Sequence, residues 1–142
     1  MAILATSALL VALATGLPVG PHDVGCNMTE MSGVHIHAQL SITNRGQTVP
    51  VPANIGLVTA GPAVICLYWL HTHDDSGLIH VEAPRGSYTL ADFFAVWGQP
   101  LSRIQVGAAH GHVRAYVDGA PYKGAPQSIP IKDGEKISLE IR

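Results

Sequence analysis

Apolar and polar side chains alternate strictly from residue 34 to residue 42. The apolar positions are Val34, Ile36, Ala38, Leu40 and Ile42, and the positions between them include His35 and His37. Successive side chains of a β-strand point to opposite faces of its sheet, so this pattern is typical of a strand with one buried face. The chain therefore has to build a sheet against a core, with both histidines on the face away from that core.

Further strand signals follow along the chain and predict a mostly β fold. Residues 63–70 form a continuous apolar run, which we expect to be a central strand buried on both faces. A short helix is indicated at about 90–97, because Thr89 is a suitable N-cap and Asp92 completes a capping box. We predict one α+β domain over residues 26–142. Its seven or eight strands would form an antiparallel sheet, a sandwich or a partly open barrel.

The N-terminal segment, residues 1–20, is apolar and resembles the hydrophobic part of a signal peptide. It has no basic residue before the apolar stretch, and it is short and rich in alanine for a transmembrane helix. We expect the protein to be exported to the periplasm, the cell surface or the medium. The segment would then be either cleaved or kept as a membrane tether.

Cys26 and Cys66 are the only two cysteines. In an exported protein, two cysteines are most simply one disulfide, here closing a loop of about 40 residues. The rival interpretation makes both thiolates copper ligands, but neither lies in a Cys-x-x-Cys or His-x-Cys arrangement. Without a Cys-x-x-Cys-His motif, the sequence also predicts no c-type haem.

The chain carries little charge. Charged residues make up 13% of the sequence, against roughly 25% in an average soluble domain. The formal net charge is −2 and no basic cluster occurs, so we expect no nucleic-acid partner. Burial of surface in a homo-oligomer or larger assembly would explain the low charge, and so would a neutral β surface.

Six of the eight histidines form three His-x-His pairs. On a strand, the two imidazoles of such a pair lie side by side on one face. Another histidine and a glutamate follow the middle pair on a returning strand. The pattern predicts a transition-metal site with the candidate ligands His71, His73, His80, His35, His37, His110, His112 and Glu82.

The middle pair precedes a turn formed by residues 74–77, Asp-Asp-Ser-Gly. A loop of two or four residues places His71 directly opposite His80, with Cβ atoms about 4.5–5.5 Å apart. A three-residue loop with a bulge instead places Thr72 opposite His80. In the first register, His71, His73 and His80 form the nucleus of the site. The two outer pairs join it only if their strands lie alongside.

Imidazole and carboxylate ligands suit copper or zinc first, then iron or manganese, and they suit Ca²⁺ poorly. Three functions are compatible with such a site. The first is an exported metal-binding protein, for metal handling or for a structural ion. The second is a mononuclear metalloenzyme, an oxidoreductase or hydrolase, with Glu82 or Asp74 as the base. The third is a self-assembling structural subunit with histidines at its interface.

The blocks HIHA, CLYWLHTHDDSGLIHVE and YTLADFFAVWGQPL resemble a group of small exported bacterial proteins over most of residues 33–140. That resemblance implies a family but no activity, because none is assigned to the group. The motif from His71 to Glu82 is also similar to the metal site of cupins, in which a His-x-His pair, a glutamate and a later histidine hold a metal in a small β-barrel. Here the glutamate is much further from the pair, so we do not infer a cupin fold.

Overall fold

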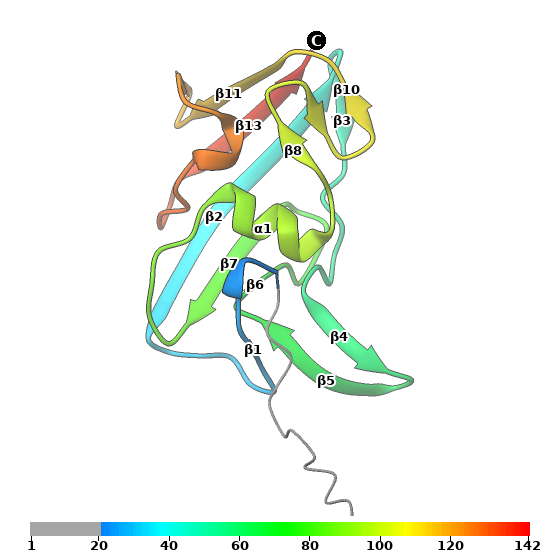
Figure 1. Ribbon diagram of the computed structural model, residues 1–142, viewed down its shortest axis with the longest axis vertical. Coiled ribbons are helices and arrows are strands. Elements are labelled where there is room, and N and C mark those ends of the chain that lie inside the picture. The colour runs from blue at the N-terminus through cyan, green and yellow to red at the C-terminus, as the bar shows by residue number, and fades with distance from the viewer. Residues whose placement is uncertain (1–20) are drawn as a thin grey trace, which may run out of the picture.

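The computed structural model describes residues 21–142 (Figure 1). The apolar segment 1–20, where we expect a signal or anchor, lies outside the described residues. The described chain begins with a short 3-10 turn, η1 (Pro21–Asp23), and is mostly β, as the sequence predicts. Within residues 21–142, no helix combines the length and the apolar character that crossing a bilayer requires.

The main sheet is built around β2 (Val34–Asn44), its longest strand. β2 pairs antiparallel with β7 (Leu78–Ala83) on one side and parallel with β13 (Lys136–Ile141) on the other. The strand order is β12 (Ala120–Pro121), β11 (Val113–Val117), β13, β2, β7 and β6 (Leu70–His71), with β3 (Gln47–Val49) attached to β2. The sheet is open at β12 and β6 and does not close into a barrel. The sheet is mixed, because β13, which lies between β2 and β11, runs parallel to β2 and antiparallel to β11.

One face of this sheet is covered by the helix α1 (Leu90–Trp97), which lies across β2 and β7 in Figure 1. The helix has the predicted bounds, and its N-terminal cap is confirmed: the Thr89 N–H and hydroxyl both donate to Asp92 Oδ2, at 2.7 and 2.9 Å. The core combines Leu90, Phe93 and Phe94 of α1 with alternate residues of three strands: Ala38, Leu40, Ile42, Ile79, Val81, Ile137, Leu139 and Ile141. The alternating polar residues of β2 and β7 therefore face away from the helix.

A second sheet has the order β1 (Cys26–Asn27), β5 (Ala63–Tyr68) and β4 (Leu57–Ala60). The prediction that residues 63–70 are buried on both faces is wrong, since Val64 and Ile65 are 47% and 40% exposed. The β4–β5 hairpin extends away from the main sheet (Figure 1), so only the end of the apolar run reaches the core. The predicted Cys26–Cys66 disulfide is confirmed, and it ties β1 to β5 where β5 enters the core.

A third small sheet consists of β8 (Leu101–Ser102), β9 (Gln105–Val106) and β10 (Ala109–His110). A last 3-10 turn, η2 (Pro126–Ser128), packs near α1. β11, which follows β10, is separated from β2 by β13. This strand order decides which histidines meet.

Candidate metal centre

β7 lies between β2 and β6, and this arrangement places three histidines in one row across the sheet. His80 of β7 pairs with His37 of β2 on one side and with His71 of β6 on the other. The predicted register, with His71 opposite His80, is confirmed. One row further along β7, Glu82 pairs with His35. The two β2 histidines, together with His80 and Glu82, lie on the sheet face opposite the helix.

His71 and His73 have the spacing of two ligands of one ion. Their Nε2 atoms are 3.3 Å apart. Two nitrogens bound to a Zn²⁺-like ion at about 2.0–2.1 Å with tetrahedral geometry are roughly 3.3–3.4 Å apart. The two rings form a hydrogen bond at this separation, and the same separation suits a shared ion.

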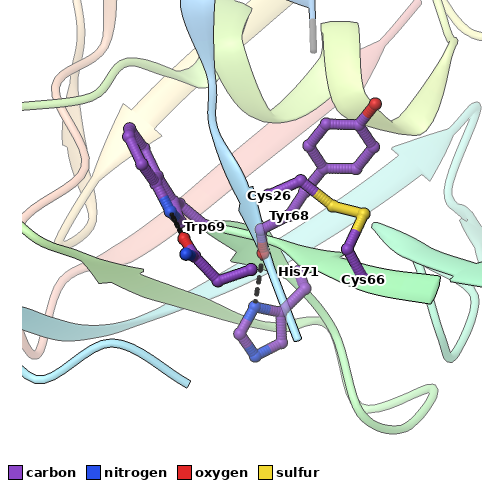
Figure 2. The surroundings of a disulfide bond; sticks show 6 residues. Cys26, Cys66, Tyr68, Trp69 and His71 are labelled. Carbon is purple, nitrogen blue, oxygen red and sulfur yellow. Dashed lines mark hydrogen bonds between the residues drawn. A yellow bond between two sulfur atoms is a disulfide. The ribbon is translucent and has the colours of Figure 1, made fainter. Parts of the chain in front are cut away.

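The His71 ring is held by the chain that precedes it. Its Nδ1–H donates to the Tyr68 carbonyl at 3.0 Å, while the Tyr68 ring points to the other side of the chain (Figure 2). This bond leaves Nε2 unprotonated and facing His73 Nε2, which is how metal-binding histidines are usually oriented. Burial of the ring lowers the pKa of His71 from 6.5 to about 4, so the side chain is a neutral ligand at neutral pH.

The backbone between the two ligands is fixed by Thr72, which is 1% exposed. Its hydroxyl donates to the Pro52 carbonyl at 2.7 Å and accepts from the Ile55 N–H at 3.1 Å. Its own N–H donates to the Ile55 carbonyl, and its carbonyl accepts from the Asn54 N–H. Because every polar group of Thr72 is bonded, the chain has little freedom to separate His71 from His73.

His80 and Glu82 complete the inner group. The His80 ring centroid lies 4.4 Å from that of His73 and 5.3 Å from that of His71. Glu82 is only 4% exposed, and its Oε1 lies 3.4 Å from His80 Nδ1. Within residues 21–142, neither Glu82 Oε2 nor His80 Nδ1 has a hydrogen-bond partner, although both atoms are buried. Burial lowers the pKa of His80, as do the neighbouring His73 and His37, while Glu82 opposes the shift.

The pair on β2 forms an outer group on the other side of β7. His35 Nε2 and His37 Nε2 are also 3.3 Å apart, and His35 Nε2 lies 3.6 Å from Glu82 Oε1. The candidate ligands thus form two groups, one of His71, His73, His80 and Glu82 and one of His35, His37 and Glu82. Within each group the ligand atoms lie within 4.8 Å of one another. Glu82 belongs to both.

The third pair does not join either group. His110 lies on β10 in the third sheet, and the His112 N–H donates to the Arg142 carbonyl at the far end of the main sheet. Both histidines are exposed. Their strands do not lie alongside β7, because β13 and β2 stand between β11 and β7.

The two candidate bases are placed differently. Asp74 is exposed, and its Oδ1 accepts the Ser76 N–H at 3.0 Å within the turn. Hydrogen bonds from Ser76 lower the pKa of Asp74, so this carboxylate serves the turn. Glu82 is the one that lies among the histidines.

One carboxylate near the centre escaped the sequence analysis. Glu30 Oε1 lies 3.6 Å from His73 Nε2, and both side chains are about half exposed. Glu30 belongs to the loop between β1 and β2, which has no strand pattern of its own. The only sequence signal was indirect: the predicted disulfide joins Cys26 to Cys66, five residues before His71, so the loop that follows Cys26 starts on the same side of the molecule as the His71/His73 pair.

The centre offers five imidazoles and one buried carboxylate on one sheet face. Imidazole nitrogens with a single carboxylate favour a transition-metal ion over Ca²⁺ or Mg²⁺, which prefer oxygen ligands. Comparison with protein-family models, with curated proteins and with solved structures finds no match to this chain.

Proposed function

We propose that the protein is an exported transition-metal-binding protein, which holds its ion through His71, His73, His80 and Glu82. The observation that carries the proposal is the grouping of the ligand atoms of His71, His73, His80 and Glu82 within 4.8 Å, together with a buried Glu82 Oε2 that has no hydrogen-bond partner within residues 21–142. A buried carboxylate oxygen without a hydrogen bond is costly. A bound cation would offset that cost and would use the unprotonated Nε2 of His71.

The donor set favours copper or zinc, with iron and manganese next. Imidazole nitrogen is a common ligand of all four ions, and three histidines with one carboxylate match the tetrahedral preference of Zn²⁺. No cysteine competes for the ion, since Cys26 and Cys66 are joined in a disulfide. This argues against a thiolate site selective for Cu(I).

Metal handling fits the site better than a structural ion does. The His73 side chain is 49% exposed, so solvent and exchanging ligands reach the centre. The hydrophobic core lies on the other face of the sheet and does not involve the ligand nitrogens. The fold therefore has its own source of stability, and the ion would enter a preformed site.

The disulfide supports a location outside the cytoplasm, because such bonds persist in oxidising compartments. Export itself would depend on the apolar residues 1–20. A metal-handling protein in the periplasm or on the cell surface would meet copper and zinc before they enter the cell.

The test is metal analysis of the full chain, purified without an affinity histidine tag. The protein is stripped with a chelator, reconstituted with Cu²⁺, Zn²⁺, Fe²⁺ or Mn²⁺, dialysed and measured by elemental analysis. We expect at least one equivalent of copper or zinc. The variant H71N/H73N should lose the ion of the inner group.

The chain supplies a matched control in its third pair. H110N/H112N removes a His-x-His pair that lies outside both groups, so it should bind as much metal as the wild type. Metal well below one equivalent with all four ions would overturn the proposal. So would equal losses in H71N/H73N and H110N/H112N, because binding would then be unspecific.

A further inference from the structure

The outer pair repeats the geometry of the inner pair. His35 Nε2 and His37 Nε2 are 3.3 Å apart, the same separation as between His71 Nε2 and His73 Nε2. Each contact is a hydrogen bond between two imidazole rings, and the same separation suits two ligands of one ion. Here the pair lies on the longest strand of the sheet, and the His37 N–H donates to Asp133 Oδ1 at 2.9 Å. The backbone of the outer pair is thus held by this bond and by the pairing of β2 with β7.

Glu82 connects the two pairs. Its Oε1 lies 3.4 Å from His80 Nδ1 and 3.6 Å from His35 Nε2, and its Oε2 is buried without a partner within residues 21–142. A carboxylate has two oxygens and about four lone-pair sites, so it can serve two cations at once. A single ion would leave one of the two histidine pairs without a role.

We infer that the centre takes two metal ions, one at His71, His73 and His80 and one at His35 and His37, with the Glu82 carboxylate shared between them. This inference rests on the proposed function, since it adds a second ion to that site. Two-metal sites in proteins typically hold their ions about 3.5–4 Å apart. The two ligand groups overlap in Glu82, and a carboxylate shared in this way is what brings two ions close together.

The two positions should differ in affinity. The inner position has three histidines, and both His71 and Glu82 are nearly fully buried. The outer position has two histidines, and the His35 side chain is 56% exposed. A second dication is also repelled by the first, and one carboxylate neutralises only one of the four positive charges. We therefore expect the inner position to fill first and the outer position to bind more weakly.

The experiment combines stoichiometry with magnetic coupling, using the full chain without a tag. Zn²⁺ calorimetry and elemental analysis should give two equivalents in two steps. Two Cu²⁺ ions that share a carboxylate couple their spins, so the Cu²⁺-loaded protein should show an electron paramagnetic resonance signal well below one spin per copper. After the first equivalent alone, the signal should correspond to one uncoupled spin.

Three variants test which residues hold each ion and couple the two spins. H35N/H37N should bind one Zn²⁺, keep the tighter step and give a full, uncoupled Cu²⁺ signal. E82Q removes the shared charge with little change of shape; it should weaken Zn²⁺ binding by at least about tenfold and restore one spin per bound copper. H110N/H112N should bind two ions and keep the reduced signal, because that pair lies outside both groups.

The outcomes separate this inference from the proposed function. One equivalent that is lost in H71N/H73N and kept in H35N/H37N leaves the proposed function intact and overturns the two-ion centre. Two equivalents with two full spins per chain would also overturn it, because the ions would not share Glu82. A chain that binds none of these metals would refute both the proposed function and the two-ion centre.

Discussion

Acidification should destabilise the metal-free protein chiefly through His71. Burial lowers the pKa of His71 from 6.5 to about 4 in the folded protein. Between these two values the unfolded chain binds a proton that the folded protein does not, so the free energy of unfolding falls as the pH falls. Well above pH 6.5 neither state is protonated and the effect disappears.

The magnitude follows from the same two pKa values. With 6.5 in the unfolded chain and about 4 in the folded protein, proton linkage gives a loss of about 2 kcal/mol between pH 7 and pH 5. This is a large part of a total stability of about 5–15 kcal/mol. The lowered pKa of His80 acts in the same direction and adds to the loss.

The assay is guanidinium unfolding with a chelator present at pH 7, 6 and 5. High denaturant salt screens exposed charges, so the pH dependence that remains reports mainly on buried groups. H71N should lose about 2 kcal/mol less than the wild type over this range, because asparagine does not titrate. H112N, which replaces an exposed histidine outside both groups, should keep the wild-type dependence. An equally steep fall in H71N would refute the assignment to His71.

Three further predictions concern the fold. Metal removal should leave the circular dichroism and the dispersion of the NMR spectrum unchanged, because the core lies opposite the ligand face; collapse on chelation would mean that the ion is structural. Replacing Cys26 and Cys66 by serine should lower the free energy of unfolding by about 3–4 kcal/mol, and a loss under 1 kcal/mol would show that the reduced chain is already constrained. T89A should cost about 1 kcal/mol in denaturant unfolding, whereas T89S keeps the hydroxyl that donates to Asp92 and should cost less; equal costs would argue against the cap.

Local patterns narrowed the inner half of the centre to two hairpin registers, which differ in the length of the loop around residues 74–77. The structure adopts the one that places His71 opposite His80. The helix cap and the disulfide could be predicted from the sequence, because each depends on a few residue types at defined spacings. These features involve neighbours in sequence or a single choice of partner.

The order of the strands in the main sheet could not be predicted from local patterns of this kind. The parallel pairing of β13 with β2 joins segments about 100 residues apart in sequence, and no turn signal encodes it. That insertion keeps His110 and His112 away from the centre. The prediction that residues 63–70 are buried on both faces was wrong for a related reason. Hydrophobicity alone does not show that the β4–β5 hairpin extends beyond the core.

The outer half of the centre depends on a contact that the same turn makes with β2. The Leu40 N–H donates to the Gly77 carbonyl at 2.9 Å, and Gly77 adopts a φ of +81°. A Cβ at Gly77 would lie 2.3 Å from the Leu40 carbonyl oxygen, so only glycine lets the turn approach this closely. Docking the turn at Leu40 fixes where β7 runs along β2, and this brings His37 opposite His80. One four-residue turn thus sets both registers, which explains how two histidine pairs far apart in sequence come to lie on either side of the same glutamate.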